Sequence, residues 1–193
     1  DMVLAVLPGS REGEVQRLAP VFLDTVRLCK EKWSDLKTLI PSANPQRKKQ
    51  IESMLNDNFS AMDIQVVEGN SRQVMTAADY ILMASGTASL EGMLLKKPMV
   101  VAYRMAPISY AIISRMLKAP YISLPNLLAD KGLVPELLQN DACPERLFAE
   151  IKRLQSCSED RQEMLDTWNS IHLELQRNAN ITAATAVLEL CRR

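Results

Sequence analysis

The chain has 193 residues, of which 47% are hydrophobic and 24% are charged, and Lys+Arg and Asp+Glu are equal at 23 each. This length allows one ordinary domain with a trailing helical segment and is too short for two full α/β domains. The balanced charge excludes a global field that would draw the protein to nucleic acid or to an anionic membrane. We therefore expect no nucleic-acid partner and only local contacts with phosphate or lipid.

The four cysteines are scattered and form no CxxC pair. Cys29 and Cys191 fall among apolar helix positions, which predicts reduced thiols packed as small hydrophobes. No signal peptide and no apolar run of membrane-spanning length is present, which favours a cytoplasmic location. Because the first residues enter a strand at once, we expect the chain to be a fragment, or a domain cut from a larger protein.

Short apolar runs alternate with helical patterns over the first half of the chain. Strands are predicted at Val3–Leu7, Leu36–Ile40, Ile64–Glu68, Tyr80–Ala84 and Met99–Ala102. Helices are predicted from an apolar stripe that runs from Val15 to Cys29 across Pro20, from Pro45 to about Leu55 after an Asn44 cap, from a Ser71 cap to Ala77, and from Ala88 to Lys96. The apolar runs are nearly continuous rather than alternating, which is typical of strands covered on both faces. The predicted fold class is α/β, with a doubly wound parallel sheet.

After Tyr103 the pattern becomes mostly helical. We predict a helix over Ile108–Lys118, a last strand at Tyr121–Leu124, a loop over Pro125–Leu133, and helices at Pro135–Gln139, Pro144–Leu154, Glu159–Gln176 and Ile181–Cys191. The apolar residues of the helix after Pro107 surround much of its circumference. A core helix is therefore favoured over one that touches acyl chains or the inner membrane, and both explanations stay open.

Two loops of the predicted sheet carry chemistry suited to a phosphate. Parallel sheets bind ligands at the carboxyl ends of their strands. In the first loop, Gly9 permits a close backbone approach, Ser10 donates a hydrogen bond, and Arg11 offers a fork that matches phosphate oxygens. In the second loop, the small residues of Ser85-Gly86-Thr87 leave the first N–H groups of a helix uncovered at the positive end of its dipole.

Glu91 lies one helical turn beyond Thr87, where a carboxylate could accept both hydroxyls of a ribose. Each of these features also has an ordinary explanation, since turns and helix caps favour the same residues and a helical glutamate is commonly just exposed. Because both loops occur at strand ends of one sheet, a phosphate site and an ordinary structural role in turns and caps are equally well supported.

Several enzyme classes are disfavoured by missing motifs. Neither loop is a Walker A sequence or a GxGxxG fingerprint, which argues against an ATPase or a dehydrogenase. There is no Gly-x-Ser-x-Gly elbow, and the single His172 lies in the helical tail, which argues against a serine hydrolase. No cluster has metal-ligand spacing, so we expect neither a metal nor another cofactor.

Ordered segments along essentially the whole chain resemble the C-terminal portion of the lipid-A-disaccharide synthase family. They are Leu7–Arg11 with Glu14-Val15, Ala84–Glu91, Pro98–Met105, Ser123–Leu128, Val134–Gln139, Arg177–Ala179 and Ala186–Leu190. The resemblance implies one half of a glycosyltransferase of the two-domain GT-B architecture. Such an enzyme would join UDP-2,3-diacylglucosamine to 2,3-diacylglucosamine 1-phosphate (lipid X), giving lipid A disaccharide 1-phosphate and UDP.

The same resemblance implies a division of labour. Residues 1–155 would form the UDP-sugar-binding, Rossmann-like domain, and residues 156–193 would be helices that pack on a missing N-terminal domain or a partner chain. The missing domain would supply the acceptor site and the catalytic base, so no residue of this chain is assigned as catalytic. We expect the chain alone to bind nucleotide and turn over nothing, and the enzyme to be cytoplasmic or peripheral to the inner membrane.

By this resemblance, the expected donor-site residues are those at strand ends and in the later segments. Diphosphate and donor-sugar contacts are expected from Ser10 and Arg11, phosphate contacts from Ser85, Gly86 and Thr87, a ribose contact from Glu91, uracil or sugar contacts from Tyr103, Arg104 and Met105, and further donor contacts from Asn126 and Gln139. Without a metal, Arg11 and the helix start after Ser85 would stabilise the charge that grows on the departing diphosphate.

Two alternatives stay open. Another UDP-sugar enzyme of the same architecture, such as the lipid II-forming glucosaminyltransferase or an epimerase, would share the phosphate loops but not the Ser123–Leu128 and Pro135–Gln139 segments. A catalytically silent nucleotide-binding module is favoured by the abrupt start. The apolar stripe of the later helices, Met164, Leu165, Trp168, Ile171 and Leu175, is expected to lack its partner in this chain and to promote association.

Overall fold

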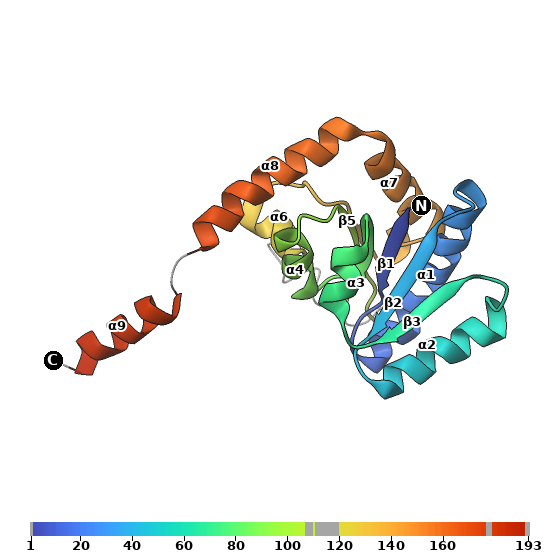
Figure 1. Ribbon diagram of the computed structural model, residues 1–193, viewed down its shortest axis with the longest axis horizontal. Coiled ribbons are helices and arrows are strands. Elements are labelled where there is room, and N and C mark those ends of the chain that lie inside the picture. The colour runs from blue at the N-terminus through green and yellow to red at the C-terminus, as the bar shows by residue number, and fades with distance from the viewer. Residues whose placement is uncertain (1, 107–109, 111–119, 177–178, 192–193) are drawn as a thin grey trace.

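Six parallel strands form the centre of the protein, in a computed structural model that describes residues 2–106, 110, 120–176 and 179–191 (Figure 1). The strands are β1 (Val3–Leu7), β2 (Lys37–Ser42), β3 (Ile64–Glu68), β4 (Tyr80–Ala84), β5 (Met99–Tyr103) and β6 (Glu136–Leu138). They lie in the order β3-β2-β1-β4-β5-β6, and each neighbouring pair is parallel. The strand order reverses between β1 and β4, which makes their carboxyl ends the switch point of the sheet. The predicted doubly wound parallel sheet is confirmed.

Helices cover both faces of this sheet. They are α1 (Glu12–Lys32), α2 (Pro45–Asn58), α3 (Ser71–Ala77), α4 (Ala88–Leu94), α6 (Leu124–Ala129), α7 (Pro144–Ser156), α8 (Ser158–Leu175) and α9 (Ala179–Cys191), with a 3-10 turn at Gln139–Asp141. Helix α1 packs beside α2 and α7 on one face, and α4 packs beside α3, α6 and α8 on the other (Figure 1). This two-sided cover follows from right-handed crossovers that start on opposite sides of the switch point.

Burial follows the position of each strand in the sheet. The inner strands β1, β4 and β5 are almost wholly buried, with Leu4 and Ile81 at 0% exposure. The edge strand β3 instead has no fully buried residue: Ile64, Val66 and Val67 are half-buried, and Gln65 and Glu68 are exposed. The expectation that every strand is covered on both faces is therefore wrong for β3, because an edge strand has a neighbour on one side only.

Local helix signals are mostly confirmed. The side chain of Asn44 accepts a hydrogen bond from the N–H of Arg47 at 2.9 Å, and Pro45 occupies the first turn of α2, as predicted. Helix α1 continues through Pro20 to Lys32. The capping residue of α3 is Asn70, in a left-handed conformation with φ of 53°, so Ser71 is the first helical residue and not the cap.

The prediction is wrong in the segment between β5 and α7. The expected strand at Tyr121–Leu124 is absent from the described residues. Helix α6 begins at Leu124, the last residue of that expected strand, and runs into the expected loop, with Pro125 in its first turn. The expected helix at Pro135–Gln139 is instead β6, which pairs with β5 in the register Val101↔Glu136. A strand of three residues carries too little local signal, and pairing with β5 decides its conformation. The predicted Ile108–Lys118 helix lies outside the described residues, apart from Tyr110.

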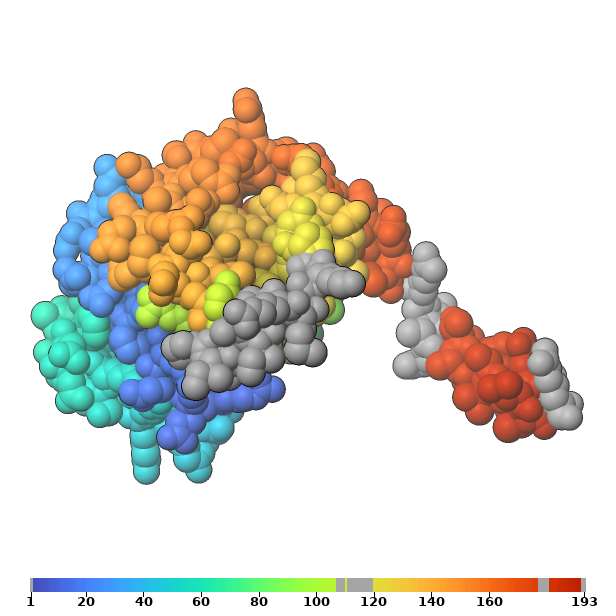
Figure 2. Space-filling view, turned by 180° about the vertical axis from the view of Figure 1, so that it is seen from behind, coloured from blue at the N-terminus to red at the C-terminus, as the bar shows by residue number. Residues whose placement is uncertain are grey.

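The two last helices differ in their surroundings. In α8, Met164, Trp168 and Ile171 are buried against the sheet domain, so the expectation that this stripe lacks a partner is wrong for these residues. Helix α9 lies apart from that domain in both views, and its Ile181 is 65% exposed (Figure 1, Figure 2).

All four cysteines are free thiols. Cys29 is buried in the core, and burial raises the pKa of its thiol to about 12. Cys191 is exposed on α9, so its predicted interior packing is wrong.

Candidate functional site: a cavity at the switch point of the sheet

A cavity of about 480 Å³ lies at the carboxyl ends of β1 to β4. Its volume falls in the range of small-molecule binding sites. The lining residues come from four strand ends and the loops after them: Leu7, Gly9, Ser10, Arg11 and Glu14; Pro41, Ser42 and Ala43; Gly69 and Ser71; and Met83, Ala84, Ser85, Gly86, Thr87 and Ala88. Five predicted site residues, Ser10, Arg11, Ser85, Gly86 and Thr87, are thus brought together in one cavity.

The loop after β1 is held by the carboxylate of Glu14. Glu14 Oε2 accepts the N–H groups of Ser10 and Arg11 at 3.2 and 3.3 Å, and Oε1 accepts Arg11 Nη1 at 2.9 Å. A Cβ on Gly9, where φ is +116°, would lie 2.7 Å from both Cβ and Oε2 of Glu14. Glycine is therefore required here by conformation and by space. Glu14 is a site residue whose part the sequence did not predict.

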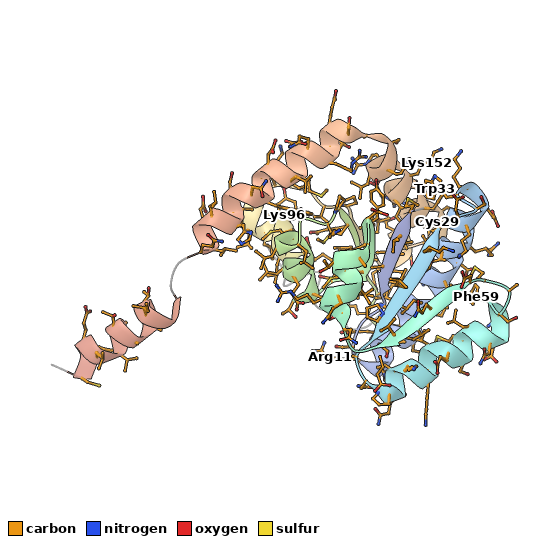
Figure 3. All side chains as sticks on the ribbon, viewed as in Figure 1. Arg11, Cys29, Trp33, Phe59, Lys96 and Lys152 are labelled. Carbon is orange, nitrogen blue, oxygen red and sulfur yellow. The ribbon has the colours of Figure 1, made fainter. Side chains whose placement is uncertain are left out.

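The side chain of Arg11 keeps 82% of its surface exposed despite its contact with Glu14. It lies at the end of the sheet opposite the N-terminus, beyond β1 (Figure 3). Glu14 is only 15% exposed, but the guanidinium itself is open to water, so it can turn to a second anion at low cost. Arg11 is thus placed to bind phosphate oxygens without a rearrangement of the core.

The turn after β4 separates anchoring groups from free groups. Ser85 uses its N–H to bond the carbonyl of Ala102 and its hydroxyl to bond the carbonyl of Ile122, each at 3.0 Å. Both donors of Ser85 are therefore committed to the protein. Among the described residues, no acceptor pairs with the N–H groups of Gly86, Thr87 and Ala88 or with the Thr87 hydroxyl. Helix α4 has only seven residues, so these individual donors matter more than a helix dipole.

A third wall comes from the loops after β2 and β3, which the sequence analysis did not assign. Gly69 and Asn70 are consecutive left-handed residues, with φ of 65° and 53°. The N–H of Gly69 donates to the carbonyl of Ser42 at 2.9 Å, which joins the two loops. The sequence Gly69-Asn70-Ser71 could have predicted this wall. It follows the carboxyl end of β3, and parallel sheets bind ligands at the carboxyl ends of their strands, as was argued for β1 and β4.

Four other predicted site residues lie at the end of β5 and just beyond β6, and none lines the cavity. Tyr103 ends β5 and is half-buried. Arg104 Nε and Nη2 donate to the carbonyls of Gln139 and Ala142, at 3.2 and 2.9 Å. The Gln139 amide accepts the N–H of Met105 at 2.8 Å and donates to its carbonyl at 3.3 Å. These bonds join the residues that follow β5 to the residues that follow β6, so the contact between the two strands continues past their ends. Arg104, Met105 and Gln139 thus have a structural role.

Asn126 is 1% exposed and lies away from the cavity lining, in α6. Its Oδ1 accepts the N–H groups of Leu133 and Val134 at 2.9 and 2.8 Å. Its Nδ2 donates to the Val134 carbonyl at 2.8 Å and to Glu136 at 2.7 Å. These bonds use the full capacity of the amide, so Asn126 holds the chain between α6 and β6.

Glu91 is exposed on α4, one turn beyond Thr87, and is not among the residues that line the cavity. The described residues hold no group of three or more His, Cys, Asp or Glu side chains that could bind a metal ion. Within the same residues, no helix combines the length and the apolar character needed to cross a bilayer.

Comparison with known families identifies the family of the chain that holds this cavity. The family model described as lipid-A-disaccharide synthetase matches residues 1–190. The chain belongs to this family. The lipid-A-disaccharide synthase of Hahella chejuensis is 51% identical over 189 residues, which cover 97% of this chain and 47% of that protein. That of Erwinia tasmaniensis is 44% identical over 191 residues, which cover 99% of this chain and 50% of that protein.

The chain therefore spans about half the length of the curated relatives that it matches. Membership of this family decides against the rival UDP-sugar enzymes that the sequence left open. It confirms the resemblance that the ordered segments carried.

Solved structures show the same fold at low sequence identity. The UDP-GlcNAc 2-epimerase from Neisseria meningitidis bound to UDP-GlcNAc has a TM-score of 0.58 at 16% identity, covering 98% of this chain and 44% of that one. The C-terminal CMP-Kdo binding domain of WaaA from Acinetobacter baumannii has a TM-score of 0.56 at 13% identity, covering 91% and 90%. The pneumococcal O-GlcNAc transferase GtfA, in complex with UDP and GlcNAc, has a TM-score of 0.59 at 12% identity, covering 96% and 36%. The chain thus has the Rossmann-like fold of a GT-B half, as the resemblance implied.

Proposed function

We propose that this chain is the donor-binding half of a lipid-A-disaccharide synthase and binds UDP-2,3-diacylglucosamine in the cavity at the switch point. The observation that carries the proposal is the meeting of Arg11 with the unpaired N–H groups of Gly86, Thr87 and Ala88 around one cavity. An exposed guanidinium and several free N–H groups are suited to a diphosphate. Membership of the lipid-A-disaccharide synthase family supports this choice of donor.

The diphosphate would lie between Arg11 and the turn after β4. The remaining wall, made by Ser42, Ala43, Gly69 and Ser71, leaves room in the cavity for other groups of the donor. Glu91 stays our proposed ribose contact, because it lies one turn along α4 from Thr87. Tyr103 stays a proposed sugar neighbour at the end of β5.

Charge determines the contribution of this chain to the reaction. As the bond between the sugar and UDP breaks, negative charge grows on the departing diphosphate. Arg11 and the preorganised N–H groups would stabilise that charge in the transition state. The hydroxyl of lipid X must lose a proton to attack the sugar, and we assign that base to the half of the enzyme outside this chain. The transfer would take place in the cytoplasm, at or near the inner membrane that holds the acylated substrates.

The direct test is a calorimetric titration of UDP into the folded 193-residue chain, with EDTA present and then with magnesium. We expect saturable binding that magnesium does not improve, and weaker binding of ADP and CMP. If a cooperatively folded chain binds no UDP, the donor site is wrongly assigned or needs the other half of the enzyme. Repeating the titration on a protein that includes the upstream half separates these outcomes.

Gly86→Ala gives a test that spares the fold. A Cβ at Gly86 meets no heavy atom within 4 Å, and its φ is not in the left-handed region. We therefore expect an unchanged Tm and UDP binding weakened about tenfold, because the methyl group would occupy the space of the approaching phosphate. Gly132→Ala is the matched control, since its Cβ would lie 3.4 Å from Tyr121, outside the cavity. Equal UDP affinity in both variants would contradict the placement of the phosphate at this turn.

A further inference from the structure

The carboxylate of Glu136, at the start of the edge strand β6, gathers donors from a neighbouring segment. Its Oε1 accepts the Ser123 hydroxyl at 2.6 Å, the Ser123 N–H at 3.0 Å and Asn126 Nδ2 at 2.7 Å. Its Oε2 accepts the N–H of Ile122 at 2.8 Å. Among the described residues, the N–H groups of Ile122 and Ser123 have no backbone acceptor. A side chain, and not a strand ladder, therefore fixes this segment.

The same segment carries a contact to the cavity. The carbonyl of Ile122 accepts the hydroxyl of Ser85 at 3.0 Å. The N–H of Ser85 is held by Ala102 of β5 at 3.0 Å. Ser85, the first residue of the turn that precedes α4, is thus fixed by two hydrogen bonds. One is to the sheet, and the other is to Ile122, whose own N–H donates to Glu136.

We infer that Glu136 is a positioning residue for the phosphate-binding turn, acting through Ile122 and Ser85; the inference rests on the proposed donor site. Glu136 does not line the cavity, so it does not touch the nucleotide. Its effect is to hold the Ile122 carbonyl where Ser85 can bond it. Ser85 in turn sets where the free N–H groups of Gly86, Thr87 and Ala88 lie. Ordering these donors before the ligand arrives lowers the cost of binding.

The requirement for a carboxylate gives a selective variant. A carboxylate accepts at both oxygens, whereas an amide accepts at one and donates at the other. In Glu136→Gln, the amide oxygen is best placed at the Oε1 position, where it keeps the donors of Ser123 and Asn126. The NH₂ group then faces the N–H of Ile122, donor against donor. This variant therefore releases Ile122 and leaves the rest of the network in place.

A double-mutant cycle on UDP affinity tests the inference. We expect Glu136→Gln and Ser85→Ala each to weaken UDP binding about threefold to tenfold, the effect of one hydrogen bond. The double variant should bind no worse than the weaker single variant, because both break the same link. The loss of unfolding free energy caused by Glu136→Gln should persist in the Ser85→Ala background. If Glu136 had a purely structural role, its effect on UDP affinity and its effect on the free energy of unfolding would respond to Ser85→Ala in the same way.

Two controls complete the experiment. Glu150→Gln removes an equivalent charge on α7, where Glu150 Oε2 accepts Arg153 Nε at 2.9 Å, and it should leave UDP affinity unchanged. If Glu136→Gln does not unfold cooperatively, Glu136→Asp replaces it, since the shorter carboxylate cannot reach all four donors. Wild-type affinity in the substituted variant, or additive effects in the cycle, would overturn the inference while leaving the donor site intact. Absence of UDP binding by the folded wild-type chain would instead remove the proposed site, and this inference with it.

Discussion

Arg11→Ala is expected to weaken UDP binding by about 10-fold to 100-fold and to leave the fold intact. Hydrogen bonds from a charged group contribute about 1.5–3 kcal/mol, which corresponds to that range. The native contact of Arg11 is an ion pair with Glu14 at 2.9 Å in which the guanidinium is open to water, and water screens such a contact so that it adds little to stability. Binding and stability should therefore separate cleanly in this variant.

The measurement is UDP calorimetry beside thermal unfolding, at low and at high salt. Arg27→Ala is a matched control, because Arg27 also pairs with a carboxylate three positions away, Asp24 at 3.2 Å. Arg27 lies near the C-terminal end of α1, away from the loop that precedes this helix, and does not line the cavity. Arg11→Lys should fall between wild type and alanine, since an ammonium keeps the charge and loses the planar fork. If Arg11→Ala binds UDP as tightly as Arg27→Ala, the guanidinium is not a phosphate ligand.

The parts of the site that the sequence predicted are those set by local chemistry at strand ends. Gly9, Arg11 and Gly86 could be placed because strong apolar runs located β1 and β4, and parallel strands put their carboxyl ends at one edge. The same logic would have reached Gly69 and Ser71 had it been applied to β3.

Most of the parts that it missed depend on contacts more distant in the sequence. Glu14 is a local exception: its carboxylate accepts N–H groups four and three residues earlier, from Ser10 and Arg11, in the capping-box position that the sequence analysis did not apply. The exchange of strand and helix around α6 and β6 does depend on a distant contact, because β6 is fixed by its partner strand. Asn126 looked available as a ligand residue, yet its amide is used fully within the protein. A polar residue in a family motif can thus support a site without touching the ligand.

Trp168→Ala is expected to be the most destabilising single change in α8, at about 3–5 kcal/mol of unfolding free energy, the range for truncating a buried aromatic residue. Trp168 is 0% exposed, and its carbonyl accepts Lys96 Nζ at 2.7 Å. Lys96 lies where α4 approaches α8, and desolvation holds the pKa of its ammonium below the ordinary value (Figure 3). The buried ring of Trp168 therefore packs α8 against the core, and its backbone carbonyl holds Lys96 beside α4, the helix that follows the turn after β4.

Trp168→Phe should cost clearly less than Trp168→Ala, because it keeps most of the aromatic volume and removes an indole N–H that is buried without a partner among the described residues. Urea unfolding followed by circular dichroism is the suitable measurement, since fluorescence would lose one of the two tryptophans. Trp33→Ala serves as the control, because Trp33 is only partly buried and stacks at a tilt on Phe148, 5.8 Å between ring centres. Equal losses at Trp168 and Trp33 would mean that α8 is not fixed through Trp168. A larger loss at Trp168 would make α8 part of the domain that holds the cavity, so the boundary between that domain and the helical tail would lie after α8 and not at residue 155.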